Sequence, residues 1–213
     1  MSEYRYMEEL LERYECLKPV EADIKKAYET IKHTYITGGK LLIAGNGGSC
    51  ADSEHIVGEL MKGFVKRRPV TDELSEKMKQ VDSIRGAALS EKLQQGLPAI
   101  ALTGHPGLTT AFLNDVDPEM IFAQQLLGYG KPGDVFLGLT TSGNSKNILY
   151  AVTVAKAKGM SVIGLTGRDG GELKQVADTT IVVPEEETYK IQELHLPVYH
   201  TLCLMLEDCF FTT

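Results

Sequence analysis

The sequence predicts an α/β protein whose central β-sheet is parallel and covered by helices on both faces. Five apolar runs have the length of β-strands, and patterns of helical spacing separate them along the chain. Strands and helices alternate in this way in parallel sheets, because a crossover must return the chain to the same end of the sheet. The strands are apolar almost throughout, which indicates burial on both faces. At 213 residues, the chain is expected to form one domain (1–213) with a sizeable core.

Two helices are expected before the first strand, within residues 1–37. Apolar side chains recur at helical spacing over 3–15 and 19–37, and Gly38-Gly39 is typical of a helix C-terminus. The predicted strands are 41–44, 99–102, 135–139, 161–165 and 180–183. The helical patterns between them are clearest at 50–62, 145–158 and 170–177.

Two further segments interrupt or close this alternation. Residues 65–96 are rich in Lys, Glu, Asp and Gln with scattered apolar side chains, which predicts an inserted helical hairpin or a lid over the sheet edge. A surface insertion of purely structural role and a substrate-gating element are equally compatible with this composition. Residues 187–211 predict a long apolar C-terminal helix interrupted by Pro197. It carries the polar side chains of Gln192, His195 and His200.

Composition and charge exclude several classes of protein. The hydrophobic share of 43% and the charged share of 24% are ordinary for a globular protein. A net charge of -7 disfavours broad nucleic-acid binding, and the basic run Lys66-Arg67-Arg68 is interpreted as a solvated loop. No run approaches the roughly 18 apolar residues of a membrane span, and no signal peptide is evident. The four cysteines lack metal-type spacing, so we expect reduced thiols and a cytoplasmic location.

Two loops rich in serine, threonine and glycine follow apolar strands and enter helical patterns. The first is Gly45-Asn46-Gly47-Gly48-Ser49, and the second is Thr140-Thr141-Ser142-Gly143-Asn144-Ser145. Backbone N–H groups at a helix start favour an anion, and glycine allows the backbone to approach a ligand closely. The serines serve equally well as simple N-caps. Two such loops together predict a site for a phosphorylated, hydroxyl-rich small molecule.

Four side chains are candidates for chemistry. His55 and Glu59 are four residues apart on the helix that leaves the first loop, so they share one helical face. They are able to converge on a metal ion or a substrate, or to form a plain surface pair. Gln192 and His200 are eight residues apart and differ by less than a quarter turn around a straight helix. A buried histidine of structural role remains the alternative for His200. No dinucleotide fingerprint is present.

Together these blocks resemble the sugar isomerase (SIS) family, and within it the bacterial phosphoheptose isomerases. The run Ala44 to His55, followed by Glu59-Leu60, is similar to the first signature of that branch. The other similar blocks are Thr140 to Asn147, Leu165 to Gly171, and Ile191 to His195 with His200. The resemblance covers nearly the whole chain apart from residues 65–96.

The resemblance implies a fold, an assembly and a reaction. The fold of the family is a five-stranded parallel α/β/α sandwich of flavodoxin-like type, assembled as a homotetramer with sites at subunit boundaries. Enzymes of this branch interconvert sedoheptulose 7-phosphate and a D-glycero-manno-heptose 7-phosphate through an enediolate.

The resemblance also assigns roles to individual residues. Glu59 is the implied base that moves a proton between C1 and C2, and His200 is the implied acid/base partner at the oxygens. The positions that match a zinc site of some members are His55, Glu59, Gln192 and His200. The positions that match substrate contacts are Asn46, Gly47, Gly48, Ser49, Asp115, Thr140, Thr141, Ser142, Ser145 and Gln192.

Three alternative functions remain open at this point. One is isomerisation of another sugar phosphate, such as a pentose phosphate. The others are a non-catalytic SIS tetramer that binds the replication initiator DnaA, and a sensor of sugar phosphates. The presence of Glu59, Gln192 and His200 favours an enzyme, because a binding protein has no chemical reason to retain a base and its partner.

Overall fold

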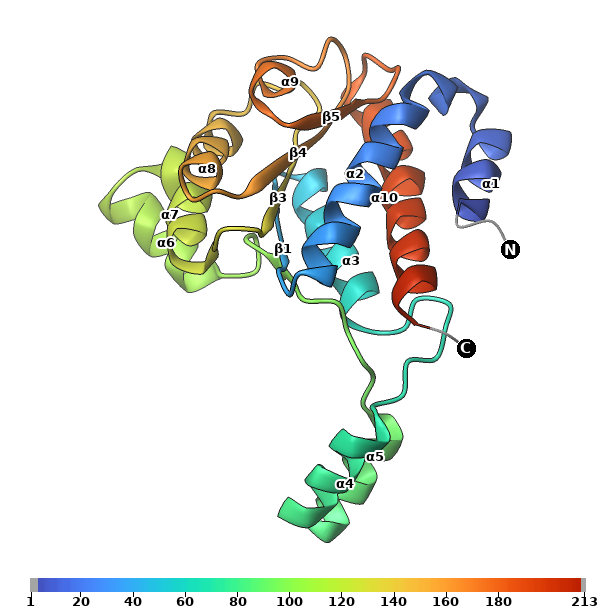
Figure 1. Ribbon diagram of the computed structural model, residues 1–213. Helices are drawn as coiled ribbons and strands as arrows, with labels where there is room; N and C mark the ends of the chain where they lie inside the picture. The colour runs from blue at the N-terminus through green and yellow to red at the C-terminus, as the bar shows by residue number, and fades with distance from the viewer. Residues whose placement is uncertain (1–3, 212–213) are drawn as a thin grey trace.

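The structure, a computed structural model, describes residues 4–211, so the expected ranges that begin at residue 1 or 3 or end at residue 213 extend outside it. Its core is a five-stranded parallel sheet in the order β2-β1-β3-β4-β5 (Figure 1). The strands are β1 (Leu41–Gly45), β2 (Ala99–Ala101), β3 (Val135–Leu139), β4 (Ser161–Thr166) and β5 (Thr179–Val182). They coincide closely with the predicted apolar runs, so the predicted parallel sheet is confirmed.

The helices also lie largely where the helical patterns predict them. The N-terminal pair is α1 (Arg5–Arg13) and α2 (Glu21–Ile36), with a 3-10 helix (Glu15–Val20) between them. The others are α3 (Gly48–Met61), α4 (Asp72–Val81), α5 (Ser83–Lys92), α6 (Pro106–Asp115), α7 (Ile121–Tyr129), α8 (Lys146–Ala157), α9 (Leu173–Val176) and α10 (Thr188–Phe210), with a short 3-10 helix (Pro118–Met120) after α6. The sequence pattern did not single out α6 and α7.

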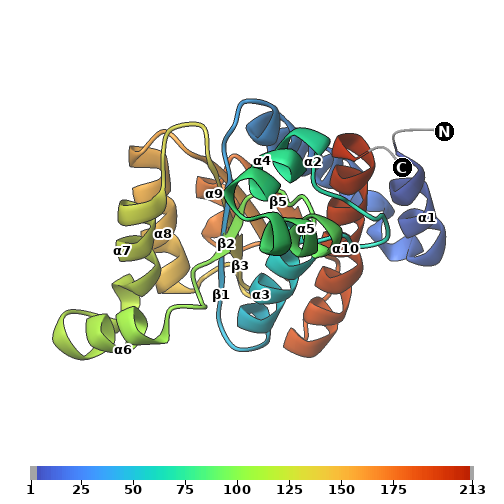
Figure 2. The same ribbon diagram turned by 90° about the horizontal axis from the view of Figure 1, so that it is seen from below.

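The sheet separates two apolar cores, and alternate residues of its strands supply them. In β1, Leu41 and Ile43 join the core that contains side chains of α1, α2, α3 and α10. Leu42 and Ala44 join the core that contains side chains of α7, α8 and α9. This alternation follows from the period of two in a strand. Figures 1 and 2 show the two helical layers on opposite faces, which confirms the α/β/α sandwich.

The strand order reverses direction between β1 and β3. The chain runs from β1 to β2 on one side, then crosses to β3 on the other side of β1. In open parallel sheets, ligands bind at the carboxyl ends of the two strands that flank such a reversal. The two serine- and glycine-rich loops follow these two strands, so the fold brings them to one edge of the sheet.

A buried ion pair fixes the chain where it leaves α3. Arg68 and Glu207 have fully buried side chains, with the Arg68 Nε 2.8 Å from a Glu207 carboxylate oxygen. The Arg68 guanidinium also donates to the carbonyl oxygens of Leu60 and Glu59 at the end of α3. The interpretation of the basic run as a solvated loop is therefore wrong for Arg68. A basic side chain satisfies the free carbonyls of a helix C-terminus well.

Three backbone amides complete the surroundings of the Glu207 carboxylate. The N–H groups of Phe64, Val65 and Lys66 donate to its oxygens. Burial alone raises the pKa of this carboxyl, but these donors and Arg68 outweigh it and hold the pKa below its usual range. The segment after α3 is thus part of the body of the protein.

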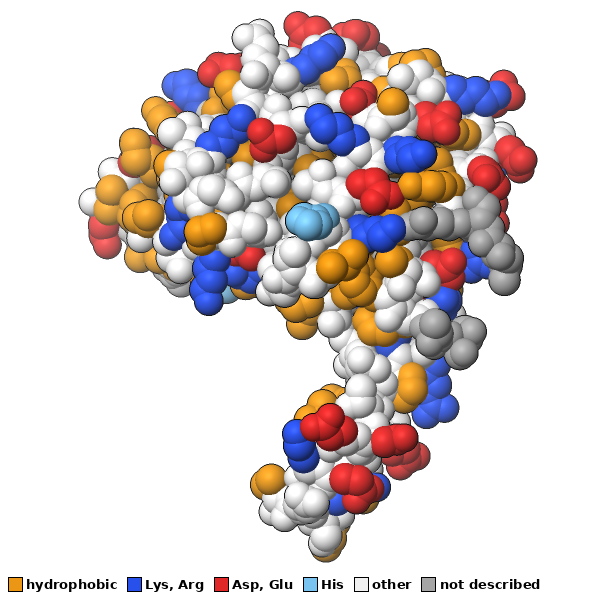
Figure 3. Space-filling model, in the orientation of Figure 1, with side chains coloured by type: hydrophobic (Ala, Val, Ile, Leu, Met, Phe, Trp, Pro, Cys, Tyr) orange, Lys and Arg blue, Asp and Glu red, His pale blue; other side chains and the backbone are white. Residues whose placement is uncertain are grey.

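The predicted insertion contains a helical hairpin, α4 and α5, that projects from the body on two extended segments (Figures 1 and 3). It extends away from the sheet rather than lying over the sheet edge. No residue within α4 is buried, and Gly86 is the buried residue of α5, packed against the backbone of Met78. Val81 is 89% exposed and Ile84 is 82% exposed. The hairpin therefore has almost no apolar core of its own.

Candidate active site

The two loops that follow β1 and β3 form one pocket with the first turns of α10. Its volume is about 410 Å³. The residues that line it are Asn46, Gly47, Gly48, Ser49, Leu139, Thr140, Thr141, Ser145, Thr188 and Gln192. Because α3 and α8 both begin at this pocket, their N-terminal N–H groups and dipoles favour an anion there. Phosphate is the ligand class that this pocket suits.

Two adjacent glycines are required in the first loop. Gly47 has a φ of 57°, a left-handed conformation that side chains rarely adopt. At Gly48, an added Cβ atom would lie 2.6 Å from the side-chain nitrogen of Gln192. The backbone of the loop therefore contacts the Gln192 amide directly. The structure places Gln192 in this pocket, where it touches the start of α3.

The second loop presents hydroxyl groups in a preformed arrangement. The hydroxyls of Thr140 and Ser145 lie 2.8 Å apart. Ser145 is the N-cap residue of α8 but makes no side-chain cap hydrogen bond, so its hydroxyl is available to the pocket. Ser142 differs, because its hydroxyl accepts a hydrogen bond from the Asn144 backbone N–H and it does not line the pocket.

The third sequence block supports the second loop from behind. Gly143 has a φ of 70°, and a Cβ atom there would collide with the backbone of Gly170. The backbone N–H of Leu173 donates to the carbonyl of Gly143, and the N–H of Gly167 donates to that of Thr141. The resemblance assigned no role to the block Leu165 to Gly171. The structure shows that this block fixes the backbone of the second loop.

A cluster of titratable side chains lies further along α3 and α10. His55 Nε2 is 3.2 Å from a Glu59 carboxylate oxygen and 3.4 Å from His200 Nε2. The other Glu59 oxygen pairs with the Lys62 ammonium at 3.0 Å. The ring of Phe64 lies 5.3 Å from that of His200 and covers it on one side. The structure thus brings His55, Glu59 and His200 together, from α3 and α10.

Two residues of this cluster were not found from the sequence. The Tyr199 hydroxyl donates to an Asp52 carboxylate oxygen at 3.0 Å, and it lies 3.0 Å from His55 Nδ1. Burial raises the pKa of Asp52, against the lowering effects of Tyr199 and His55. Asp52 precedes His55 by three residues on α3, which was the one available signal for it, whereas nothing in the sequence pairs Tyr199 with α3.

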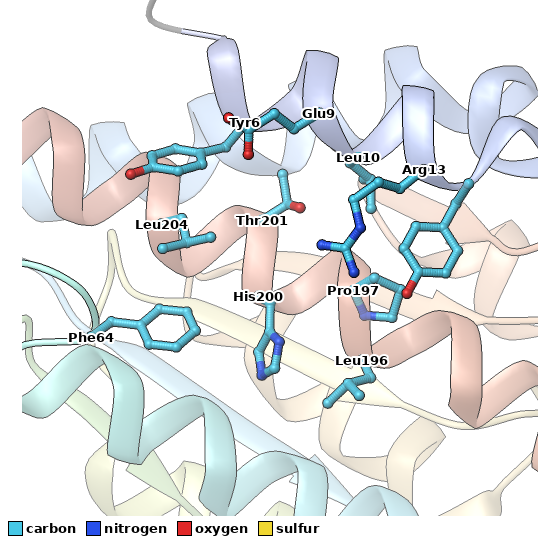
Figure 4. A pocket seen from close by; sticks show the side chains of 11 residues that line it. Tyr6, Glu9, Leu10, Arg13, Phe64, Leu196, Pro197, His200, Thr201 and Leu204 are labelled. Carbon is cyan, nitrogen blue, oxygen red and sulfur yellow. The ribbon is translucent and has the colours of Figure 1, made fainter.

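His200 also lines a second cavity, of about 190 Å³, between α1 and α10 (Figure 4). Glu9 and Arg13 of α1 line the same cavity. The pKa of His200 is lowered, chiefly by desolvation and then by the neighbouring His55, while Glu59 opposes the shift. The imidazole is therefore biased toward its neutral form, which suits a group that both accepts and donates protons.

Two other polar residues of the sequence analysis lie apart from this cluster. Asp115 ends α6 on the exposed surface, where its carboxylate accepts a hydrogen bond from Asn114. His195 lies one turn of α10 from Gln192, is fully buried, and neither ring nitrogen has a hydrogen-bond partner among the described residues. Burial lowers the pKa of His195 to about 4, and the nearby backbone of Thr166, which makes no hydrogen bond of good geometry to the ring, opposes this shift.

The donor atoms of the cluster match a metal site in pairs. No group of three or more His, Cys, Asp or Glu side chains in residues 4–211 is arranged to hold one. Two zinc ligands at about 2.0–2.1 Å in a tetrahedral site are roughly 3.3–3.4 Å apart. The separations of His55 Nε2 from Glu59 Oε1 and from His200 Nε2 are close to this value. The pairs fit zinc in chemistry and spacing, whereas Gln192 lies in the phosphate pocket.

Comparison with known proteins places this arrangement in a family. A family model described as SIS domain matches residues 4–95 and 75–167. The chain belongs to the SIS domain family. Among curated SIS relatives, a phosphoheptose isomerase from Aneurinibacillus thermoaerophilus is 38% identical over 204 residues, which cover 96% of this chain and 88% of the relative. One from Burkholderia pseudomallei is 39% identical over 190 residues, covering 89% and 83%.

A solved SIS structure agrees with these relatives. The phosphoheptose isomerase from Francisella tularensis matches with a TM-score of 0.76 and 31% identity, and the match covers 95% of each chain. The activity class of this SIS chain is therefore that of an aldose–ketose isomerase acting on a phosphosugar. None of the helices in residues 4–211 combines the length and apolar character that a membrane crossing requires.

Proposed function

We propose that this chain interconverts sedoheptulose 7-phosphate and D-glycero-manno-heptose 7-phosphate. The observation that carries the proposal is that α3 and α10 connect two dissimilar sites. Both helices begin at the phosphate pocket, and both carry the cluster of Glu59, His55 and His200 further along their length. A sugar phosphate needs both sites, one for its phosphate and one for its reacting carbons.

The separation of the two sites favours a long sugar. Gln192 in the pocket and His200 in the cluster are eight residues apart, which is about 12 Å along an α-helix. A heptose 7-phosphate carries its phosphate and its reacting carbons C1 and C2 at opposite ends. A pentose 5-phosphate has fewer carbons between these groups and spans less of the distance. Binding energy at the phosphate then orients the distant carbonyl.

The proposed mechanism moves one proton between carbons and one between oxygens. In the ketose-to-aldose direction, the Glu59 carboxylate removes a proton from C1, and the electron pair forms the enediolate. His200 gives a proton to O2 and takes one from O1. Glu59 then returns its proton to C2, which leaves the aldehyde at C1. The Lys62 ion pair holds one Glu59 oxygen in place while the other faces the His55 imidazole.

We propose zinc as the metal of this site. The two pairs that His55 makes, with Glu59 and with His200, would bring two imidazole nitrogens and a carboxylate oxygen to the ion once the side chains rotate to converge on it, a set that leaves room for substrate. Gln192 belongs instead to the phosphate pocket of the same chain. When bound, the ion supplies Lewis-acid stabilisation of the charge that develops on the substrate oxygens.

We also propose assembly as a homotetramer, in line with the family resemblance. The hairpin of α4 and α5 supports assembly of some kind, because exposed side chains such as Val81 and Ile84 are of the type that oligomers bury. Sedimentation equilibrium of the full chain measures the number of subunits directly. A monomer at micromolar concentration would contradict this part of the proposal.

The experiment that tests the reaction is turnover of sedoheptulose 7-phosphate by the purified protein, with and without added zinc, with the aldose product detected directly. Zinc-dependent turnover supports both the reaction and the metal. Turnover that is equal in the presence of a chelator supports the reaction and removes zinc. Binding of the sugar phosphate without turnover indicates a sensor. Faster turnover of a pentose phosphate indicates the shorter substrate.

A further inference from the structure

Tyr199 occupies a position between a carboxylate and an imidazole of α3. Its hydroxyl donates to Asp52 Oδ1 at 3.0 Å and lies 3.0 Å from His55 Nδ1. The Tyr199 ring is 1% exposed, and it packs edge-on against the His55 ring with centroids 5.5 Å apart. The hydroxyl therefore lies between two hydrogen-bond partners, and it can donate its single proton to only one of them.

Counting donors and acceptors fixes the direction of both hydrogen bonds. A phenol has one O–H to donate and lone pairs to accept with. An ionised Asp52 carboxylate can only accept, so the Tyr199 proton is directed at Asp52 and the Tyr199 oxygen is left only as an acceptor toward His55. His55 Nδ1 must then carry a proton. In the neutral ring, a proton on Nδ1 leaves a lone pair on Nε2.

The freed lone pair faces the reacting cluster. His55 Nε2 is the atom that lies 3.2 Å from the Glu59 carboxylate and 3.4 Å from His200 Nε2. A lone pair directed at a carboxylate and at a second imidazole creates an electron-rich point. Such a point attracts a proton or a cation, whereas an N–H at the same place would simply bond to Glu59.

We propose that Tyr199 and Asp52 are positioning residues that hold His55 as its Nδ1–H tautomer and present its Nε2 lone pair to Glu59 and His200. The effect of this tautomer on metal binding and catalysis rests on the proposed function. The tautomer itself is a property of the free protein. Groups that hydrogen-bond the second nitrogen of a ligating histidine fix its tautomer in this way. Here the partner is a tyrosine backed by a carboxylate.

The first test is Tyr199→Phe, read by imidazole ¹⁵N NMR on metal-free, substrate-free protein. The His55 signals are identified by their loss in His55→Gln. In the wild type we expect the proton on Nδ1. In Tyr199→Phe, Nδ1 has lost its acceptor, so the proton is expected on Nε2, where it donates to Glu59. A His55 that keeps its proton on Nδ1 in the variant, or that carries it on Nε2 in the wild type, overturns the proposal.

Tyr35→Phe is the matched control. Tyr35 is a buried tyrosine of α2 whose hydroxyl has no hydrogen-bond partner among the described residues. Removing this hydroxyl makes the same chemical change in a similarly buried place, away from the cluster. We expect unchanged His55 signals. If Tyr35→Phe moved them as far as Tyr199→Phe does, the shift would reflect general loosening of the core and the proposal would fail.

Asp52→Asn supplies a second variant that keeps the tyrosine. A neutral amide accepts the Tyr199 proton more weakly than a carboxylate does and also offers N–H donors to the Tyr199 oxygen, so more of the Tyr199 proton turns toward His55 Nδ1 and selects the Nε2–H form. We therefore expect a rise in the Nε2–H fraction. An unchanged tautomer in this variant would show that Asp52 plays no part, and would contradict the proposal for that residue.

Loss of the Nδ1–H tautomer should also be visible in zinc affinity and in the kinetics of isomerisation. By competition with a chelator, Tyr199→Phe should bind zinc about 10- to 100-fold more weakly, the usual cost of losing such a partner. kcat should fall with KM for the sugar phosphate little changed, because the phosphate pocket is untouched. A wild type that shows the Nδ1–H tautomer but no isomerase activity would sink the proposed function alone. An active wild type with the opposite tautomer would sink this inference alone.

Discussion

The phosphate pocket and the acid/base cluster lie on the same two helices but are built on different principles. Backbone amides, glycines and hydroxyls form the pocket, and they come from short contiguous loops such as Gly47-Gly48 and Thr140–Ser145. The cluster consists of titratable side chains whose properties depend on contacts between distant segments, as with Tyr199 and Asp52. Local sequence can encode an anchor for an anion, whereas tuned acid/base chemistry requires tertiary packing.

Glu59→Gln should separate the two regions most clearly. Removing the base is expected to lower kcat by about 10²- to 10⁴-fold, while binding of the sugar phosphate stays close to wild type. Steady-state kinetics together with calorimetric binding of the substrate measure both. Glu54→Gln is a suitable control, because Glu54 lies on the same helix and contacts Thr103 instead. An unchanged kcat would show that Glu59 is not the base.

Arg68→Met should test how far the buried ion pair of Arg68 with Glu207 stabilises the protein at the end of α3, the helix that carries the cluster. The change leaves the Glu207 carboxylate buried without its charged partner and frees the carbonyls of Glu59 and Leu60. We expect the free energy of unfolding to fall by about 3–5 kcal/mol, measured by urea denaturation. Adding Glu207→Leu should restore part of the loss, since no uncompensated charge then remains. Equal stability of all three proteins would contradict a structural role for this pair.

His195, which lies on α10 between Gln192 of the pocket and His200 of the cluster, should make the free energy of unfolding depend on pH. The unfolded imidazole has its ordinary pKa of 6.5 and the folded one a pKa of about 4, so the unfolded chain binds more protons between these values. Stability is therefore full above pH 6.5 and is lost as the pH falls, by roughly 3 kcal/mol over the window. His195→Leu should flatten this part of the profile. Parallel profiles for the two proteins between pH 7 and 4.5 would contradict the assignment.

Ser145→Ala should weaken substrate binding at the phosphate pocket and leave the acid/base cluster unchanged. A hydrogen bond to a charged group contributes roughly 1.5–3 kcal/mol, so KM for the sugar phosphate is expected to rise about 10- to 100-fold. The matched change Ser142→Ala should have the smaller effect, because the Ser142 hydroxyl caps its own loop. The same KM for both variants would mean that the two serines contribute equally and that the pocket extends further than its lining residues indicate.

Much of the fold followed from the sequence, because the strands are apolar on both faces and alternate with helices. In β1, apolar side chains at successive positions supply the cores on both faces of the sheet. Arg68 was misjudged for a physical reason. A basic run is usually solvated, and its burial depends on Glu207, which is 139 residues away. Nor did the pattern single out α6 and α7, whose packing against the 3-10 helix Pro118–Met120 and against α8 is tertiary.

The candidate site divides in the same manner. The pocket residues could be named because each loop is a contiguous motif with a known preference for anions. His55 and Glu59 could be paired by helical spacing alone. The contact of Tyr199 with α3, and the contact of Gln192 with Gly48 rather than with His200, both depend on how α10 lies across α3. No local pattern specifies that crossing.

The projecting hairpin has a practical consequence of a different kind. It is inserted between two segments that lie side by side at the bridge of Pro69 with Gln94, immediately after the Arg68 anchor, where the backbone N–H of Gln95 also donates to the Arg68 carbonyl oxygen. Segments of this sort, exposed and nearly coreless, tolerate cutting and extension well. The tip at Asp82 lies between the exposed Val81 and Ile84, so a fluorophore attached there would report on subunit assembly, and a foreign module grafted there would block any contact between subunits that the hairpin makes.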